Sequence, residues 1–345
     1  EGHCVLPEDE LLPAAEQLLE IPTDILRDAL SQELQEDIVV SDTIGDKHCI
    51  FLGHLWNAEK VIAERLRILA AGKPKWPFVD ADKAIPWVEQ LLDVTLAASQ
   101  QDAVKTAVSS KVMVITGGPG VGKTTLVNAI LRILAAKDVT VALAAPTGRA
   151  AKRLSESTGL EAKTIHRLLE VDPKQGGFKR SAEEPLECDL LVIDETSMVD
   201  VSLMASVVKA LPDRAALILV GDVDQLPSVG PGQVLADIIN SGAAPVATLT
   251  EIFRQAAQSQ IVTNAHQVNA GRMPNLIVKK GSETDFYFVE ARDPEDAIIK
   301  IIEIVKNRLP KRFKFDSIQD IQVLCPMNRG GIGARSLNVE LQKAL

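Results

Sequence analysis

Aromatic residues are scarce in this chain. Phe, Trp and Tyr make up 3% of its 345 residues, and Tyr287 is the single tyrosine. Aliphatic side chains must therefore build most of the core, and we expect most of the few aromatic rings to be packed there rather than stacked on bases. Long apolar runs are missing too, because no run reaches the roughly 18 residues that a membrane crossing needs.

Cysteine and positive charge are also in short supply. The four cysteines lie far apart with no C-x-x-C pair, which predicts reduced, cytosolic thiols and a cytoplasmic protein. The first ten residues are polar and acidic, unlike a signal peptide, and the chain does not begin with Met. A net charge of −10 argues against a wholly basic nucleic-acid binder but leaves room for a local basic groove.

The most informative segment is a glycine-rich stretch between an apolar run at 112–115 and a helical pattern at 126–136. It fits G-x-x-x-x-G-K-[ST], a loop that wraps nucleotide phosphates with its backbone N–H groups. We expect Lys123 to reach the β- and γ-phosphates and the Thr124 hydroxyl to hold Mg²⁺. The predicted nucleotide-binding residues are Gly117, Gly118, Pro119, Gly120, Val121, Gly122, Lys123, Thr124 and Thr125.

Two carboxylates follow a second apolar run at 190–193. Such a run predicts a buried parallel strand, and open α/β sheets bind ligands at the carboxyl ends of their strands. We expect Asp194 to bind Mg²⁺ and Glu195 to polarise the attacking water.

Three further segments carry weaker signals. Gln225 follows the apolar run 217–220 and is placed to touch a γ-phosphate, with a loop without ligand as the alternative. Arg254, beside Phe253, is a candidate arginine finger. Residues 144–153 place a hydroxyl, a glycine turn and three cations at a strand-to-helix junction, which suits nucleic-acid phosphates; a solvated helix start is the alternative.

The overall pattern predicts an α/β fold, a P-loop parallel sheet flanked by helices. The region before it is mainly helical with two short strands, and both a winged-helix-like module and a plain helical accessory region fit it. Beyond residue 258 two more strands and a helix are expected. The strand candidates are 38–40, 49–52, 112–116, 139–144, 190–194, 216–220, 247–249, 286–290 and 321–325, and the last helix is 296–309.

Taken in order, the segments resemble the RecD-like branch of the superfamily-one DNA helicases, which includes the α subunit of exodeoxyribonuclease V and moves 5′→3′. The matching segments are 117–125, 145–151, 164–168, 194–198, 221–230 and 253–255. The resemblance covers nearly the whole chain. It implies an accessory module at 1–75, a linker and lead-in helix at 76–95, a first RecA-like ATPase domain at 96–258 and the start of a second at 259–345.

The resemblance also implies an activity and a set of roles. The protein would be an ATP-dependent helicase that uses ATP and Mg²⁺ on single-stranded DNA and duplex junctions, in recombination or repair. Gln100 would read the adenine, and a hairpin at about 168–187 would split the duplex, with a surface loop as the alternative. The implied catalytic residues are Lys123, Glu195, Gln225 and Arg254; the implied DNA contacts are Pro146, Thr147, Arg149, Lys152, Thr164, His166 and Arg167.

One departure from the family pattern affects the expected activity. A strand-gripping segment and a second catalytic arginine of the family's second RecA-like domain do not occur before Leu345. We therefore expect part of a longer helicase that does not unwind DNA alone. The helicase part of a conjugative relaxase shares these motifs, and a nucleotide- or DNA-binding module without turnover is the remaining alternative.

Overall fold

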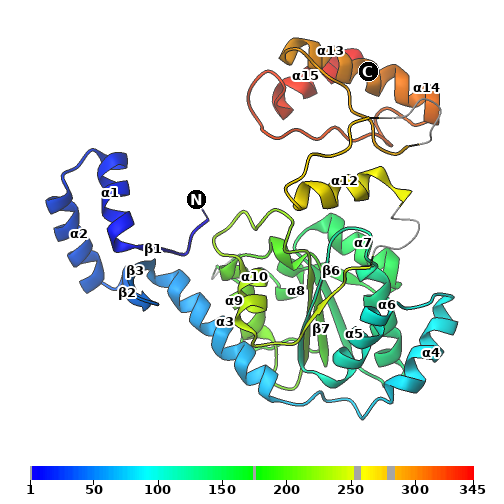
Figure 1. The fold of residues 1–345 in the computed structure, drawn as a ribbon. Helices are drawn as coiled ribbons and strands as arrows, with labels where there is room; N and C mark the ends of the chain where they lie inside the picture. The colour runs from blue at the N-terminus through cyan, green and yellow to red at the C-terminus, as the bar shows by residue number, and fades with distance from the viewer. Residues whose placement is uncertain (1, 174–175, 252–257, 278–283) are drawn as a thin grey trace. The chain divides into compact units, whose positions relative to one another are not determined.

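The chain forms two compact units in the computed structural model, residues Glu1–Pro274 and Asn275–Leu345 (Figure 1). The structure describes residues 2–173, 176–251, 258–277 and 284–345. Among the described helices, none combines the length and apolar character that a membrane crossing requires. The domain boundaries predicted at 75, 95 and 258 do not coincide with the division at Pro274, and they stay predictions.

A six-stranded parallel sheet forms the centre of the first unit, in the order β6-β5-β7-β8-β4-β9 (Figure 1). Five of its strands were predicted, whereas β6 was not, because it has only three residues and follows α7 closely. The strands are β4 (Val112–Thr116), β5 (Val141–Ala145), β6 (Ala162–Thr164), β7 (Leu190–Ile193), β8 (Ala216–Gly221) and β9 (Val246–Thr248).

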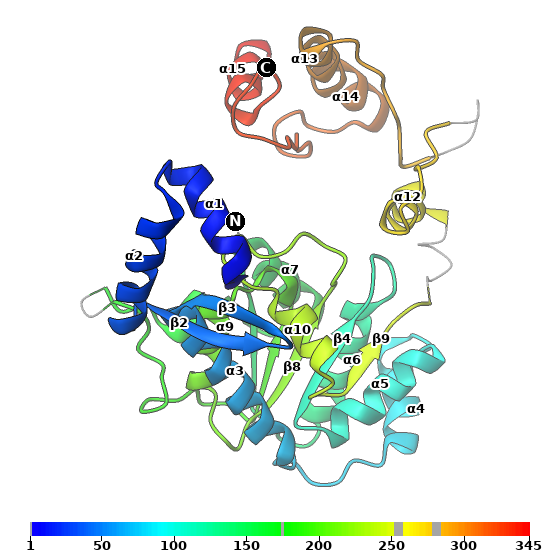
Figure 2. The same ribbon diagram turned by 60° about the vertical axis from the view of Figure 1, so that its left-hand side comes forward.

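Helices cover both faces of this sheet (Figures 1 and 2). The first face packs on α3 (Gly53–Ala71), α8 (Ile165–Leu169), α9 (Val201–Ala210) and α10 (Val234–Ser241). The second packs on α4 (Ala81–Leu92), α5 (Ala98–Ser109), α6 (Lys123–Ala135) and α7 (Gly148–Thr158). Strand side chains alternate between two hydrophobic cores: Leu217 and Leu219 enter the first, whereas Ile218 and Val220 enter the second.

The long helix α3 belongs to the core of the sheet domain although the sequence assigned it to the accessory module. Leu66 and Leu69 are buried in the first hydrophobic core, against side chains of α9. Arg65 fixes the end of this contact, because its guanidinium donates to the carbonyls of Val208 at 3.2 Å and Leu211 at 2.8 Å. The N-terminal module is therefore anchored to the sheet domain by a shared core.

The N-terminal module is built on an antiparallel sheet in the order β1-β3-β2. Its elements are β1 (Val5–Pro7), α1 (Glu8–Leu19), α2 (Thr23–Gln35), β2 (Val39–Ile44) and β3 (Lys47–Leu52). The two predicted short strands are present, each six residues long, and β1 was not predicted. The winged-helix-like module and the plain helical accessory region both stay predictions.

The segment after α8 turns back on itself without forming the two predicted strands. Val171 and Phe178 make a single antiparallel bridge. The backbone N–H of Lys179 donates to the carbonyl of Glu170 at 2.8 Å, and the guanidinium of Arg180 lies 2.7 Å from the Glu170 carboxylate. Residues 174–175 lie outside the described residues, and a duplex-splitting role stays a prediction.

The second unit is helical in its described part. It contains α13 (Pro294–Glu303), the π-helical turn η2 (Ile304–Arg308), α14 (Leu309–Phe313) and α15 (Ala334–Ala344). The predicted helix at 296–309 is confirmed as α13 and η2. The predicted strands at 286–290 and 321–325 are wrong, since both segments lack strand structure. Apolar alternation favours a strand only where a neighbouring strand can pair with it, and the described residues of this unit supply none.

Candidate nucleotide and DNA site

The glycine-rich loop connects β4 to α6, as predicted, and its glycines are required by close contacts. A Cβ on Gly117 would lie 2.5 Å from the carbonyl oxygen of Leu249, a backbone atom that cannot give way. Gly120 and Gly122 adopt φ values of 77° and 78°, which glycine reaches without strain. The loop therefore depends on glycine at these three positions.

Helix α6 begins at this loop with an open N-terminus. Its N-cap residue, Gly122, has no side chain to cap the first turn, so the backbone N–H groups there are available to an anion. The Lys123 ammonium donates to the carbonyls of Gly117 and Gly118 at the rim of the same loop. Free N–H donors and a cation at the start of a 13-residue helix are suited to the phosphates of a nucleotide.

The two carboxylates follow β7 directly, as predicted. The carboxylate of Asp194 accepts a hydrogen bond from the backbone N–H of Glu195 at 2.9 Å. Glu195 has a left-handed backbone with φ 54° and ψ 40°. For a residue with a Cβ this conformation costs about 1 kcal/mol, and the surrounding structure must compensate for it. The side chains of Asp194 and Glu195 both line the cavity at the strand ends.

Burial shapes the protonation of both carboxylates. It raises the pKa of Asp194, while the hydrogen bond from Glu195 and the charges of Lys123 and Arg153 oppose the rise. Burial also raises the pKa of Glu195, and the neighbouring charge of Asp194 adds to the effect. A carboxyl whose pKa is raised toward neutrality is a better proton acceptor from water.

One cavity of about 770 Å³ brings these groups together. The loop residues 118–125, Asp194, Glu195 and Gln225 line it, so the carboxyl ends of β4, β7 and β8 contribute to one site. Three lining residues were not assigned to it from the sequence: Val94 and Thr95, in the connection between α4 and α5, and Arg153 on α7. No short motif marks the first two. Arg153 was grouped with the DNA-binding cations because it lies beside Lys152 in the sequence.

Gln100 contacts the glycine-rich loop rather than the open cavity. Its side chain is 1% exposed. The amide nitrogen lies 3.4 Å from the carbonyl oxygens of both Val121 and Gly122, and the amide oxygen accepts from the N–H of Ala97 at 3.0 Å. These contacts brace the loop, and a role in reading adenine stays a prediction.

A histidine that the sequence did not single out touches the outer side of the loop. His266 lies on α12 (Gln260–Asn269). Its Nε2 is 3.3 Å from the carbonyl oxygen of Pro119, and a Cβ on Gly118 would lie 2.7 Å from its ring. Helix α12 therefore packs against the loop through this ring.

The predicted DNA-binding residues are brought together only in part. Lys152, Thr164 and Arg167 line a groove of about 450 Å³ with Lys163, a cation that the sequence did not flag. Thr147 and Thr164 also cap the N-termini of α7 and α8. Each hydroxyl accepts a hydrogen bond at 3.2 Å from the backbone N–H of the residue three positions later in the sequence.

The remaining predicted residues lie elsewhere. The exposed His166 packs its ring edge-to-face on Phe178, with centroids 5.7 Å apart, and Pro146 and Arg149 do not line the groove. Arg254 lies outside the described residues, so its role as an arginine finger stays a prediction.

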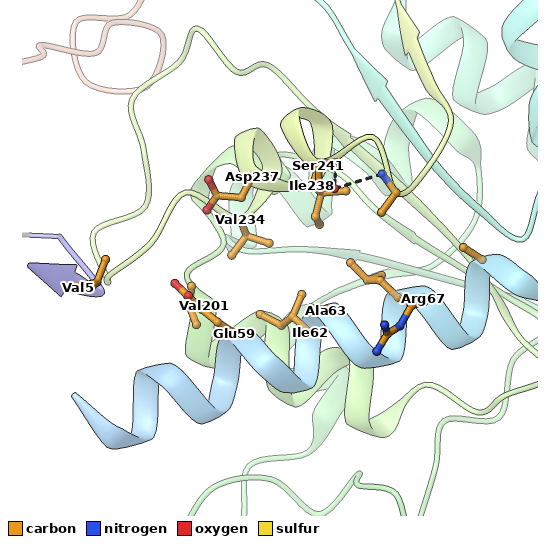
Figure 3. A pocket seen from close by; sticks show the side chains of 13 residues that line it. Val5, Glu59, Ile62, Ala63, Arg67, Val201, Val234, Asp237, Ile238 and Ser241 are labelled. Carbon is orange, nitrogen blue, oxygen red and sulfur yellow. Dashed lines mark hydrogen bonds between the residues drawn. The ribbon is translucent and has the colours of Figure 1, made fainter. Parts of the chain in front are cut away.

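A second cavity, of about 840 Å³, lies between α3 and α10 (Figure 3). Aliphatic side chains such as Ile62 and Val234 face it, and Glu59 and Asp237 lie toward one end with Arg67 toward the other. None of the residues predicted to bind nucleotide or DNA lines this cavity.

The chain is similar in sequence to known proteins. A sequence profile described as an AAA domain matches residues 100–231. The chain is 35% identical over 293 residues to the ATP-dependent RecD2 DNA helicase of Deinococcus radiodurans, covering 85% of this chain and 38% of that protein.

Two mycobacterial relatives carry the name RecBCD enzyme subunit RecD. The protein from Mycolicibacterium smegmatis is 30% identical over 328 residues, covering 86% of this chain and 57% of the relative. The one from Mycobacterium tuberculosis is 33% identical over 276 residues, covering 72% and 46%. The chain thus spans between 38% and 57% of the length of these three relatives. With the ordered motifs assembled on a P-loop sheet, the similarity over most of its length shows that the chain belongs to the RecD-like branch of the superfamily-one helicases.

Proposed function

We propose that this chain binds and hydrolyses ATP as part of an ATP-dependent DNA helicase acting on single-stranded DNA. The observation that carries the proposal is the 770 Å³ cavity, which joins the open N-terminus of α6, Lys123 and the Asp194–Glu195 pair. Each of these groups has a counterpart in phosphoryl transfer: N–H donors and a cation for the phosphates, and carboxylates for a metal and for water.

The roles follow from chemistry and position. Lys123 exchanges the loop carbonyls for the β- and γ-phosphates, and Glu195 accepts a proton from the attacking water. Thr124 and Asp194 line the same cavity and offer the hydroxyl and carboxylate oxygens that Mg²⁺ prefers. When bound, Mg²⁺ supplies positive charge that offsets charge on the phosphates. Gln225, exposed at the edge of the cavity, is positioned to report whether a γ-phosphate is present.

We place single-stranded DNA in the groove formed by Lys152, Lys163, Thr164 and Arg167. Cations and a hydroxyl at the carboxyl edge of a sheet suit a phosphate backbone. We also propose a cytoplasmic location, which the four free cysteines support. A role in recombination and association with other subunits are further proposals, motivated by the names of the mycobacterial relatives.

The test is ATP hydrolysis measured with and without single-stranded DNA. We expect hydrolysis that DNA stimulates, and we expect Lys123→Ala to lose both hydrolysis and most of the affinity for ATP. Glu195→Gln separates binding from chemistry: affinity should change little, while hydrolysis falls by about 10²–10⁴ as expected for loss of a general base.

Two results would contradict the proposal. Near-normal hydrolysis by Lys123→Ala would place the active site elsewhere. Tight nucleotide binding by the unaltered chain without any hydrolysis, with or without DNA, would favour a binding module without turnover.

A further inference from the structure

Two cations that are adjacent in sequence on helix α7, Lys152 and Arg153, line two different sites. Lys152 lines the DNA-side groove together with Thr164 and Arg167. Arg153, the next residue, lines the nucleotide cavity instead. Successive side chains on a helix point about 100° apart, so neighbours in sequence can serve opposite sides of one helix.

Arg153 shares the nucleotide cavity with Asp194 and Glu195. Its charge acts on both Asp194 and Glu195, as does the charge of Lys123. These are the groups that flank the terminal phosphate in the proposed function, whereas the loop between α4 and α5 contributes Val94 and Thr95.

The guanidinium of Arg153 is available for a ligand. Among the described residues it has no hydrogen bond and no ion pair, and its side chain is exposed. Other arginines of this unit are committed: Arg65 to Asp213 at 2.7 Å and Arg180 to Glu170 at 2.7 Å. A planar guanidinium offers several N–H donors in a fixed fork that matches phosphate oxygens.

We propose that Arg153 binds the terminal phosphate of a nucleoside triphosphate and thereby distinguishes it from the diphosphate. This inference rests on the proposed nucleotide site and adds to it a residue that acts from the DNA-facing helix. Lys123 contacts the phosphates from the loop, and Arg153 contacts the last of them from α7.

The experiment compares the affinities of the full chain for ADP and for a non-hydrolysable ATP analogue, by competition against a fluorescent nucleotide. Arg153→Gln should weaken binding of the triphosphate analogue by at least about tenfold, the loss of one charge-assisted hydrogen bond. Binding of ADP should change by less than about threefold, because ADP lacks the phosphate in question. Arg153→Lys keeps the charge without the fork and should retain part of the discrimination.

Lys137→Gln is the matched control. Lys137 is an exposed cation just beyond the C-terminal end of α6, away from the loop and both sites. The Lys137→Gln variant should leave the affinities for ADP and for the triphosphate analogue unchanged. This result would exclude a general effect of reduced positive charge.

The outcomes separate this inference from the proposed function. If the unaltered chain binds neither nucleotide, the nucleotide site itself is wrong. If the unaltered chain binds both and Arg153→Gln keeps the same ratio of affinities, only the assignment of Arg153 is overturned. An equal loss of both affinities would also overturn it, since that pattern indicates a general structural role.

Discussion

Glu195 combines a left-handed backbone with a side chain whose charge is disfavoured by burial. Both features lower the stability of the folded chain. If stability alone mattered, glycine or a neutral amide would be the better residue at this position. The presence of glutamate there indicates that the residue serves another purpose.

The raised pKa of Glu195 predicts a pH-dependent effect of Glu195→Gln on stability. Below the ordinary carboxyl pKa the side chain is protonated in both folded and unfolded chains, so its burial costs no charge. As pH rises through the folded-state pKa, the folded chain must ionise a partly buried group, and stability is lost. Glu195→Gln should therefore raise the thermal midpoint more at pH 7.5 than at pH 5.

Thermal unfolding at both pH values checks this prediction. Glu64→Gln on α3 is the control, because Glu64 is exposed and its charge stays in water. A gain from Glu195→Gln that is equal at both pH values would mean that relief of a buried charge is not its cause.

At the scale of elements, α3 links the N-terminal module to the sheet domain. Leu69 is 0% exposed in the first hydrophobic core, whereas the adjacent Ile68 is 47% exposed on the same helix. Leu69→Ala should lower the free energy of unfolding by about 2–5 kcal/mol, through reduced burial and the cavity left behind. Ile68→Ala should cost less than about 1 kcal/mol, because most of that side chain is already in water.

Urea denaturation of the two variants measures the difference. Similar, small decreases for both would show that α3 is not part of the sheet domain in solution. The same helix also shows what a sequence leaves undetermined. Its apolar periodicity predicts a buried face, but periodicity does not say which domain covers that face.

At the scale of the whole molecule, the net charge of −10 conflicts with binding of a polyanion unless the positive charge is local. Affinity for single-stranded DNA should fall as salt rises. Neutralising Lys163 and Arg167 together should make the slope of log affinity against log salt concentration shallower by about 1.4. Each DNA phosphate that the variant no longer neutralises accounts for about 0.7 of this change.

Titration of single-stranded DNA at several salt concentrations provides the slopes. Lys137→Gln with Lys209→Gln is the control, since both cations are exposed at the C-terminal ends of helices and neither lines the groove. If the control pair changes the slope as much as the groove pair, the DNA does not lie in the groove.

Much of the first unit could be predicted, because its signals are local. The loop at 117–125 and the carboxylates after β7 carry their chemistry in consecutive residues, and the central strands are uninterrupted apolar runs. What failed depended on partners distant in the sequence. The short strands β1 and β6 form because β3 and β5 lie beside them, while the apolar segment at 286–290 finds no such neighbour among the described residues.

The candidate site shows the same limit on a finer scale. Arg153 and Lys152 are equivalent cations in the sequence, and only the turn of a helix assigns them to different sites. Gln100 was assigned to the adenine by family resemblance, yet its amide contacts the loop carbonyls. Residue type can be inferred from a sequence motif, whereas the contacts of a side chain depend on the fold around it.

The alternation of strand side chains between two cores has a consequence for how substitutions combine. No strand side chain in β8 serves both faces, so Leu219 and Ile218 have separate sets of neighbours. Energetic coupling between substitutions requires contact or shared partners, and it fades beyond roughly 7–10 Å. Changes on opposite faces that are also farther apart than this along the backbone should therefore be nearly additive, while changes in contact within one face should not. The sheet separates the two hydrophobic cores, so that compensating substitutions can accumulate in one core independently of the other.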